Sequence, residues 1–278
     1  MSNLTEKSRV AFYGHRGSFS EEAALKLCGA GTELVSRSTF ESLFSSIDEG
    51  LADYILTPFE NSLVGSVARP LDLLLESSLV IKAEIITRIS LHLIGCPGAS
   101  LEEIKRIESH PTALAECENF FSKHPQIKRL AAGDTAGCVA RIIQSGDKTH
   151  AAIASKRAAE IYGGVVLRER VEDYTENYTR FFLLAQEADL PEKADKISLM
   201  LRLPQCDDVI RRAMESFTAR GINLLKIEPR PIKTQRRQRR FYLELQAQAR
   251  DSEVVEALSE LTRVFHMRWR ATGFSRKK

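Results

Sequence analysis

The chain passes from strand to helix in the segment Val10-Ala11-Phe12-Tyr13-Gly14-His15-Arg16-Gly17-Ser18-Phe19-Ser20, and this transition determines its fold class. The apolar run Val10–Tyr13 predicts a buried strand, and the glycines that follow it predict a tight turn. A helix is expected from about Ser20 to Cys28, because Ser18 and Glu21 have the spacing of a capping box. A unit of this kind is the building block of an α/β fold.

The same order of elements recurs as far as about Ala188. Further strands are expected at Ala52–Leu56, Ile107-Glu108, Leu130-Ala131 and Ala151–Ala154, with helices after Gly65-Ser66, at Pro111, after Asp134-Thr135 and after Ser155. In a parallel sheet these helix starts open at one edge. Free N–H groups and the positive end of the helix dipole attract carboxylates there. The pattern therefore favours an anionic small-molecule ligand.

The composition excludes several classes of protein. With 43% hydrophobic and 28% charged residues, the 278-residue chain is not collagen-like, a coiled-coil array or wholly disordered. A net charge of +3 gives no indication of a nucleic-acid partner. The most apolar stretch, Val80–Gly95, contains charged residues, and Met1–Lys7 does not resemble a secretory signal. We therefore expect a soluble, cytoplasmic protein without membrane contact.

The five cysteines are widely spaced and odd in number, which argues against a disulfide framework or a structural zinc site. Each of them is expected to be a small buried apolar residue: Cys28, Cys96, Cys117, Cys138 and Cys206. Ligand-spaced His, Cys or Asp clusters and a phosphate loop are missing from the sequence. The sequence therefore contains no recognisable motif for a metal ion or a phosphate-bearing cofactor.

Polar residues around 189–196 predict a linker, and a second unit follows. Its expected elements are strand Ile197–Leu203, helix Asp207–Ala219, strands Ile222–Glu228 and Phe241–Gln246, helix Glu253–Thr262 and strand Val264–Trp269. This βαββαβ order is that of a ferredoxin-like sandwich, whose exposed edge strands favour pairing with a second copy. The basic run Arg236–Arg240 is interpreted as a solvated hairpin tip, with RNA contact as the alternative.

Five motifs resemble those of the prephenate dehydratase family, in the family's order and over about Arg9 to Gly273. They are Gly14-His15-Arg16-Gly17-Ser18-Phe19-Ser20, Glu60-Asn61-Ser62-Leu63-Val64-Gly65-Ser66-Val67, Ser109-His110-Pro111, Asn177-Tyr178-Thr179-Arg180-Phe181, and Arg220-Gly221-Ile222-Asn223-Leu224 with Lys226-Ile227-Glu228. The last resembles the regulatory ACT domain that follows the catalytic domain in this family.

The resemblance implies a fold and an activity. It implies a two-lobed catalytic domain over residues 8–188, like a type II periplasmic binding protein, with lobe one at about 8–85 and 165–188 and lobe two at about 86–164. It further implies an ACT domain over 197–275, a homodimer or homotetramer formed through ACT domains, and conversion of prephenate to phenylpyruvate, water and carbon dioxide without a cofactor. Arogenate dehydratase, or a non-catalytic two-lobed ligand sensor, are the alternatives.

The resemblance assigns proton donation to Thr179, whose alternative role is that of a β-branched strand residue. Alternation along a strand aims Thr179 and Arg180 at opposite faces. Arg180 is therefore either a carboxylate anchor or part of an ion pair that bridges the lobes. Phe181 either packs on the substrate ring or belongs to the core.

Hydroxyl and amide groups near the expected helix starts complete the predicted substrate site: Asn61, Ser62, Gly65, Ser66, Ser18, Ser20, Thr135 and Ser155. Gly65 and Ser66 are expected to offer backbone N–H groups at a helix start. His110, beside Pro111, is interpreted as a structural cap rather than an acid.

The ACT region departs from the family pattern. Pro204-Gln205-Cys206-Asp207-Asp208 stands where the family has Pro-Gly-Ala-Leu, so the glycine that lets the backbone approach an amino acid is replaced. The family's Glu-Ser-Arg-Pro is changed to Glu228-Pro229-Arg230-Pro231. Asn223 and Leu224 remain candidate effector contacts. We therefore predict weak or absent inhibition by phenylalanine.

Overall fold

The computed structural model describes residues 8–186, 196–204, 207–231, 238–248, 251–265 and 268–276. For residues 202–204, 207–209, 238–239, 262–265 and 268–276 it describes the backbone alone. The chain forms two compact units, one drawn from Met1–Pro70 and Ile85–Phe181 and the other from Leu71–Glu84 and Phe182–Lys278. Strands β5 (Val80–Arg88) and β11 (Tyr178–Ala185) contribute residues to both units.

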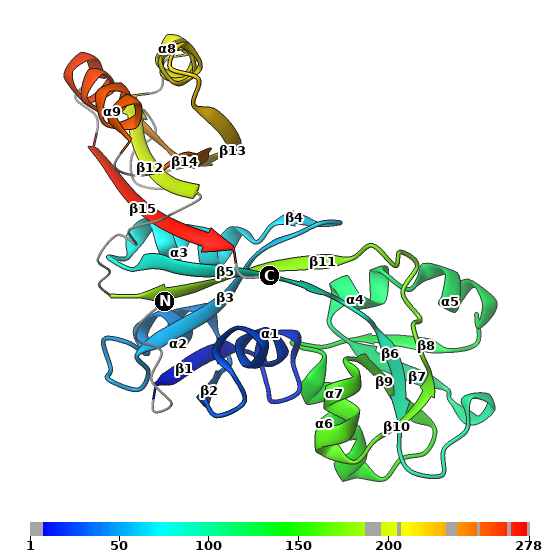
Figure 1. Ribbon diagram of the computed structural model, residues 1–278. Helices are drawn as coiled ribbons and strands as arrows, with labels where there is room; N and C mark the ends of the chain where they lie inside the picture. The colour runs from blue at the N-terminus through cyan, green and yellow to red at the C-terminus, as the bar shows by residue number, and fades with distance from the viewer. Residues whose placement is uncertain are drawn as a thin grey trace. The chain divides into compact units, whose positions relative to one another are not determined.

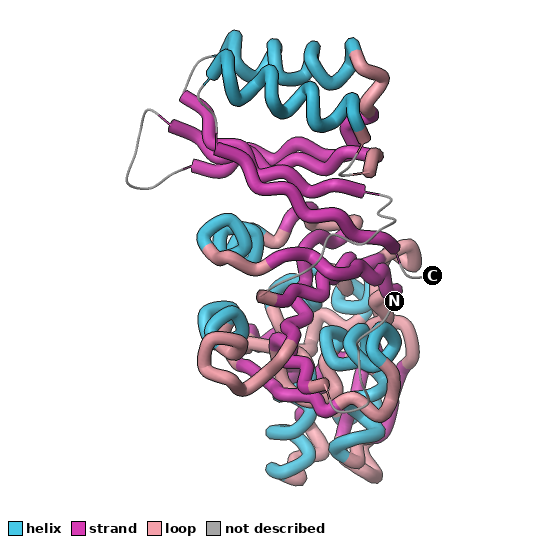
Figure 2. Tube along the Cα trace, turned by 60° about the vertical axis from the view of Figure 1, so that its left-hand side comes forward, coloured by secondary structure: helices cyan, strands magenta, loops and turns pink. Residues whose placement is uncertain are grey.

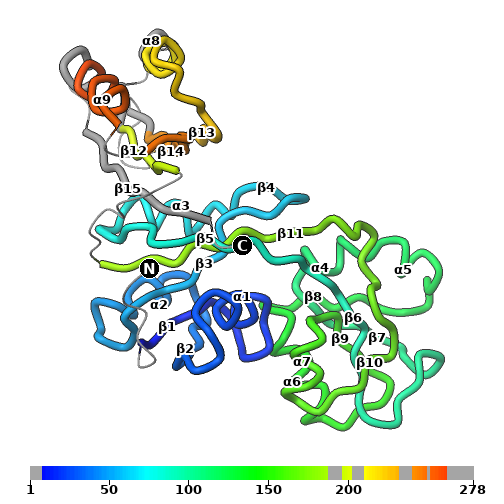
Figure 3. Tube along the Cα trace, viewed as in Figure 1, coloured from blue at the N-terminus to red at the C-terminus, as the bar shows by residue number. Residues whose placement is uncertain are grey.

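The first sheet of the first unit is built around β1 (Arg9–Tyr13), which lies parallel to β2 (Glu33–Arg37) and β3 (Tyr54–Asn61). Its strand order is β5-β11-β3-β1-β2, and Figure 3 shows β11 alongside β3 and β5, far away in sequence. Helices α1 (Phe19–Cys28) and α2 (Phe40–Ser45) pack on it. The strand and helix predicted from residues 10–28 are confirmed. The predicted strand Ala52–Leu56 is displaced, because β3 runs from Tyr54 to Asn61.

The second sheet of this unit has the order β10-β6-β9-β7-β8 (Figure 1). Its strands are β6 (His92–Gly95), β7 (Arg106–Ser109), β8 (Lys128–Ala131), β9 (His150–Ala154) and β10 (Val165–Arg168). Helices α6 (Ala136–Ser145) and α7 (Lys156–Tyr162) follow β8 and β9, and a short 3₁₀ helix covers Leu101–Glu103. The predicted strands at 107–108, 130–131 and 151–154 are confirmed, and Gly163 ends α7 in the left-handed conformation that favours glycine.

The helix predicted at Pro111 is divided into two short helices, α4 (Pro111–Ala115) and α5 (Glu118–Lys123). The carboxylate of Asp173 accepts hydrogen bonds from the backbone N–H groups of Glu118 and Asn119, each at 2.9 Å. These bonds stabilise the start of α5, after the chain has turned at Glu116. The side chain of Glu116 points to the site described below.

Gly65 and Ser66 form β4, a short strand that pairs antiparallel with the end of β3, and helix α3 (Ala68–Glu76) begins only afterwards. The expectation that they lie at a helix start is therefore wrong. Their backbone groups belong to a hairpin ladder, in which Gly65 pairs with Asn61 and Ser66 with Glu60. Gly65 has a φ of +82°, which favours glycine at this turn.

The second unit contains the predicted ferredoxin-like fold. Its elements are β12 (Lys196–Pro204), α8 (Asp207–Ala219), β13 (Asn223–Pro231), β14 (Gln238–Gln246), α9 (Ser252–Phe265) and β15 (Arg268–Arg276). The antiparallel sheet has the order β13-β14-β12-β15, and Figure 2 shows the two helices side by side over it. The last strand was expected at Val264–Trp269, but α9 continues to Phe265 and β15 begins only at Arg268.

The segment Leu71–Glu84 joins this unit through ion pairs. Arg230 of β13 donates two hydrogen bonds of 2.8 Å to the carboxylate of Asp72, and Arg240 pairs with Glu76 at 3.2 Å. The predicted departure at Gln205-Cys206 and the basic residues Arg236-Arg237 lie outside the described residues. Within the described residues, every helix is too short or too polar to cross a membrane.

Candidate functional site

Asn61 and Thr179 meet where β3 ends and β11 begins. The amide nitrogen Nδ2 of Asn61 donates to Thr179 Oγ1 at 3.1 Å and to Asn177 Oδ1 at 2.7 Å. Its oxygen Oδ1 accepts from the backbone N–H groups of Leu63 and Val64, at 2.8 and 3.1 Å. These four contacts require the nitrogen to face Thr179 and the oxygen to face the hairpin, so they fix the orientation of the amide.

The Asn61 contact also determines how the Thr179 hydroxyl can act. An amide N–H can only donate, so the oxygen of Thr179 is the acceptor and its own proton is directed elsewhere. Thr179 is 9% exposed, which places this donor in a water-poor position. Such a hydroxyl suits donation of a hydrogen bond to an oxygen that gains negative charge.

Asn177 extends the network to the turn between α4 and α5. Its side chain is fully buried, and its Nδ2 donates to Glu116 Oε2 at 2.9 Å. Burial raises the pKa of Glu116, the Asn177 hydrogen bond opposes this rise, and the negative charge of Glu172 adds to it. Hydrogen bonds therefore link the side chains of Glu116, Asn177, Asn61 and Thr179 in series, and each bond helps to orient the next side chain.

Ser62 ties the hairpin to β11. Its N–H donates to the Tyr178 carbonyl at 2.9 Å, its Oγ accepts from Tyr178 N at 3.0 Å, and the same hydroxyl donates to the Glu176 carbonyl at 3.2 Å. The hairpin tip beyond it is solvent-exposed, with Leu63 at 43% and Val64 at 61%. Ser62 thus fixes the base of an exposed loop next to Thr179.

Arg180 lies on the other face of β11 from Thr179, as alternation predicts. Its guanidinium is 3.6 Å from the Glu60 carboxylate and 5.9 Å from the Phe59 ring centroid. Both contacts come from β3, the neighbouring strand, so this ion pair joins two strands of one sheet. Phe181 is 2% exposed and belongs to the core in this structure.

The starts of α1 and α7 are in contact, although α1 packs on the first sheet and α7 on the second. Ser155 Oγ donates to the Gly17 carbonyl at 2.5 Å and accepts from Ala158 N at 3.0 Å, so its hydroxyl is used within the protein. Ser18 accepts from Glu21 N at 3.3 Å. The Glu21 carboxylate accepts from Gly17 N at 2.7 Å and from Arg157 at 2.9 Å. The predicted capping box is therefore only half formed.

The start of α6 joins the same region. Asp134 is hydrogen-bonded to His15 of the first glycine-rich turn and accepts from Gly137 N at 3.0 Å. Thr135 makes no side-chain cap, so Asp134 alone caps this helix.

His110 accepts from Thr112 N at 3.2 Å, and burial lowers its pKa, as suits a neutral capping imidazole. The starts of α1, α6 and α7 are in contact, but they lie on two sheets rather than at one edge of a single parallel sheet, as the sequence predicted. Ser20 is buried at 7% exposure.

Two residues of the site were not predicted as such: Asn177 belongs to a motif quoted above but was given no role, and Glu116 was not named at all. Asn177 could have been found, because it precedes Thr179 by two residues and alternation places both on one face. Glu116 carries no such signal, because the turn that presents it interrupts a predicted helix. Among the residues that the structure describes, no group of three His, Cys, Asp or Glu side chains could hold a metal ion.

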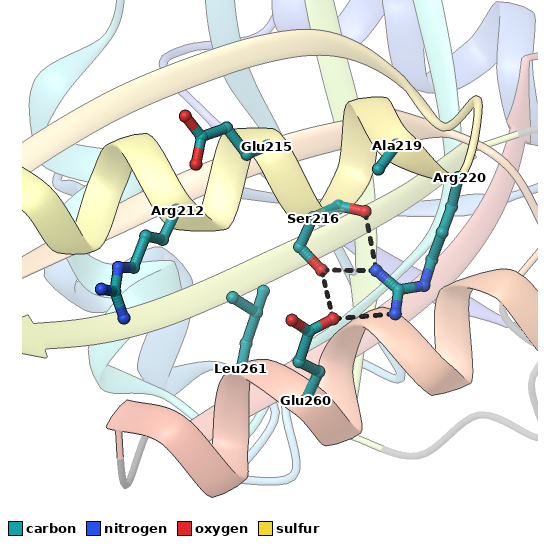
Figure 4. Close-up of a pocket in the computed structure, with 7 residues that line it drawn as sticks. All are labelled: Arg212, Glu215, Ser216, Ala219, Arg220, Glu260 and Leu261. Atoms are coloured by element: carbon teal, nitrogen blue, oxygen red, sulfur yellow. Dashed lines mark hydrogen bonds and ion pairs between the residues drawn. The ribbon is translucent and has the colours of Figure 1, made fainter.

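A pocket of about 490 Å³ lies between α8 and α9 in the second unit (Figure 4). Arg212, Glu215, Ser216, Ala219, Arg220, Glu260 and Leu261 line it. Arg220 donates to Ser216 Oγ at 2.8 Å and pairs with Glu260 at 2.8 Å, so charges within the pocket compensate each other. The predicted effector residues lie on β13, where Asn223 Nδ2 donates to Gln246 Oε1 at 3.0 Å and Leu224 packs on the core.

The family model and the curated relatives indicate one family. The family model described as prephenate dehydratase matches residues 10–189. The bifunctional chorismate mutase/prephenate dehydratase of Neisseria gonorrhoeae is 32% identical over 253 residues, which cover 91% of this chain and 70% of the relative. Arogenate dehydratase 2 of Petunia hybrida is 40% identical over 240 residues, or 84% of this chain and 60% of the relative. The crystal structure of prephenate dehydratase from Arthrobacter aurescens in complex with L-Phe has a TM-score of 0.87 and 28% identity, covering 96% of this chain and 90% of that chain.

Proposed function

Because this chain belongs to the prephenate dehydratase family, we propose that it converts prephenate to phenylpyruvate, water and carbon dioxide. The observation that carries the proposal is the hydrogen bond from Asn61 to Thr179, which leaves the Thr179 proton available to a ligand. The chain spans 70% of the Neisseria relative and 60% of the Petunia relative, so their further activities are not transferred to it.

The reaction restores an aromatic ring. The bond between the ring and its carboxylate breaks, carbon dioxide leaves, and the electron pair of that bond enters the ring. At the opposite ring carbon the bond to the hydroxyl oxygen breaks, and the oxygen departs with that electron pair. The departing hydroxide takes up one proton from solvent, directly or relayed through the Thr179 hydroxyl, and becomes water. The protein therefore has to stabilise charge on the departing oxygen and to hold two carboxylates.

Thr179 stabilises the departing oxygen by donating a hydrogen bond. A threonine hydroxyl is too weak an acid to lose its proton outright near neutral pH, so it acts as a donor or relays a proton. Asn61 keeps the Thr179 oxygen occupied as an acceptor, and this contact directs the proton toward the ligand. Asn61 is thus a positioning residue, held in turn by Asn177 and by the hairpin N–H groups.

The carboxylates bind at the helix starts and the hairpin. Ser18 and Ser20 at the start of α1, Thr135 at the start of α6, and Gly65 and Ser66 beside Asn61 are the proposed contacts. Ser62 and Ser155 hold these segments through hydrogen bonds of their own, and Arg180 either contacts a carboxylate or keeps its ion pair with Glu60. A dianionic substrate is met here by side-chain hydroxyls and helix dipoles, since Glu21 and Asp134 already accept from the N–H groups of Gly17 and Gly137.

The proposal is tested by turnover of prephenate by the purified full chain, followed as formation of phenylpyruvate. Thr179→Val preserves shape and removes the hydroxyl, so kcat should fall about a hundredfold or more, the usual cost of losing one donor to a developing oxyanion. Thr179→Ser keeps the hydroxyl and should retain much of the activity. Full activity of Thr179→Val would contradict this role of Thr179, and a native chain without turnover would contradict the function.

Arogenate is the second candidate substrate, because the chain is 40% identical to an arogenate dehydratase. Arogenate carries an ammonium group where prephenate has a keto group, and the leaving oxygen is the same. Thr179 therefore serves both reactions equally. The ratio of kcat/KM for the two substrates, measured on one preparation, decides between them.

The ferredoxin-like domain acts as a regulatory ACT domain and as the contact between copies of the chain. Leu225 and Ile227 on β13 are 43% and 38% exposed, and β13 is an edge strand of the described sheet. An edge strand with exposed apolar side chains is well suited to pairing with a second copy. Light scattering at several concentrations measures the oligomeric state, and Ile227→Asp should favour the monomer. A monomeric native protein would exclude this assembly.

A further inference from the structure

Thr87 of β5 has a buried hydroxyl without a hydrogen-bond partner. The residue is 5% exposed, and its Oγ1 neither donates to nor accepts from another group. Burial of a hydroxyl without a compensating hydrogen bond is costly, so it is rare in native proteins and is often associated with a functional role. The position of Thr87 relative to β11 indicates what that role is.

The register of β5 and β11 follows from one hydrogen bond. Ile89 N, just past the end of β5, donates to the Asn177 carbonyl, just before the start of β11, at 2.8 Å. The two strands are hydrogen-bonded neighbours. If they were parallel, a contact of the end of one with the start of the other would leave no overlap between them. They therefore run antiparallel, as Figure 1 also shows.

This register places Thr87 directly opposite Thr179. In an antiparallel pair, residues that share a ladder hydrogen bond face each other, and the next such pair lies two residues along each strand. Two residues back from Ile89 is Thr87, and two residues forward from Asn177 is Thr179. Side chains that face each other in this way lie on the same face of the sheet. Burial agrees, since Ile85, Thr87 and Ile89 are buried and Arg88 between them is exposed.

We propose that Thr87 is a second catalytic hydroxyl, which donates a hydrogen bond to the same departing oxygen as Thr179. The Cβ atoms of such a pair are about 4.5–5.5 Å apart. A single oxygen between them can therefore lie at about 2.7–2.8 Å from both Oγ atoms. The role rests on the proposed function, and it assigns to the site a residue outside the five motifs from which that function was inferred.

The chemistry of the departing oxygen suits two donors. As the carbon–oxygen bond breaks, the oxygen gains a full negative charge and has several lone pairs to be stabilised. Thr179 supplies one hydrogen bond and Thr87 a second, and neither has to lose its proton. Because both residues are nearly excluded from water, each donor is more effective than it would be in solution.

Thr87→Val tests the role, because it preserves shape and removes only the hydroxyl. With prephenate, or with arogenate if that is the substrate, kcat should fall about a hundredfold while KM changes little. Thr87→Ser should restore most of the loss. Thr57→Val is the matched control: Thr57 is another buried strand threonine, 1% exposed, whose Oγ1 donates to the Pro58 carbonyl, and its loss should leave kcat unchanged.

Thermal unfolding separates a catalytic from a structural role. An unpartnered buried hydroxyl destabilises the fold, so Thr87→Val should have a Tm equal to or above that of the native chain. A lower Tm would show that the hydroxyl has a structural partner, and an unchanged kcat would show that it does not contact the reacting atoms; either result overturns the proposal. A native chain that turns over neither substrate contradicts the proposed function instead.

Discussion

The amide of Asn61 lies 3.1 Å from the hydroxyl of Thr179, across 118 residues of sequence. The contact exists because β3 and β11 are adjacent in the sheet and because the hairpin N–H groups hold the amide oxygen on the other side. The activity of Thr179 should therefore depend on Asn61 even where Asn61 does not touch the substrate.

Asn61→Asp tests this dependence with almost no change of shape. A carboxylate still accepts from the Leu63 and Val64 N–H groups, but it cannot donate to Thr179. The Thr179 proton then turns toward the new carboxylate and away from the ligand. We expect kcat to fall about a hundredfold, with the fold retained in circular dichroism. Asn119→Asp, the same change on the exposed surface of α5, should leave kcat unchanged; equal activity of both variants would remove Asn61 from the mechanism.

Gly17→Ala should weaken substrate binding by separating the starts of α1 and α7. A Cβ at Gly17 would lie 2.7 Å from the Cα of Ala158, and the φ of +82° adds strain. Gly29→Ala is the control, because Gly29 has a φ of +98° and open space around it. Gly29→Ala should cost about 1–3 kcal/mol of unfolding free energy through backbone strain alone, and Gly17→Ala should cost more, because its Cβ also meets the backbone of Ala158. Only Gly17→Ala should raise KM, by about tenfold, and equal KM values would show that the contact is irrelevant to substrate binding.

Helices and strands that follow from local sequence patterns could be predicted, whereas those that depend on packing against distant segments could not. The strand Val10–Tyr13, its turn and α1 follow from local pattern, and so does the ferredoxin-like order of the second unit. The expected strand Ala52–Leu56 was displaced, and β2 and α2 were not predicted, because β2 is only half buried and α2 has six residues. Such elements are stabilised by packing on β1, which a local window does not contain.

The same limit applies to the site. The motifs placed Asn61 and Thr179 in one site, but nothing local shows that Asn61 donates to Thr179 or that Glu116 supports Asn177. Ser155 was predicted to bind substrate from its cap position, whereas its hydroxyl donates to Gly17, 138 residues away. Gly65 and Ser66 form a strand rather than a helix start, because they pair with β3. The contacts of Asn61, Glu116 and Ser155 are long-range hydrogen bonds, whereas the pairing of Gly65 with Asn61 is local and was missed because the turn between them was not recognised as a hairpin.

Phenylalanine should inhibit the enzyme weakly or not at all, since the resemblance places Gln205 where the family pattern has a glycine, and glycine lets a backbone approach a ligand most closely. An assay of initial rates against L-phenylalanine concentration measures this. We expect no more than a slight decrease at micromolar concentrations. Gln205→Gly, which restores the family residue, should increase sensitivity, whereas strong micromolar inhibition of the native chain would refute the prediction.

Glu116 should make the fold less stable as the pH rises, and Glu118, two residues later, should do the opposite. Burial raises the pKa of Glu116 above its usual 4.5, so folding favours the protonated carboxyl; that stabilisation is complete below about pH 4.5 and is lost as the pH rises through the folded pKa. Its hydrogen bond to Asn177 survives in Glu116→Gln, since an amide oxygen also accepts. Unfolding in urea should therefore show Glu116→Gln gaining stability relative to the native chain between pH 4 and pH 7.

Glu118→Gln provides the matched control for this pH dependence. The hydrogen bond from Arg129 holds the pKa of Glu118 below 4.5, so its stabilisation is present above that pH and is lost on acidification through the folded pKa. Glu118→Gln should therefore lose stability relative to the native chain as the pH rises. The effect should be small, because this pair is exposed and screened by salt. If both variants showed the same sign of pH dependence, burial of Glu116 would not be the cause of its raised pKa.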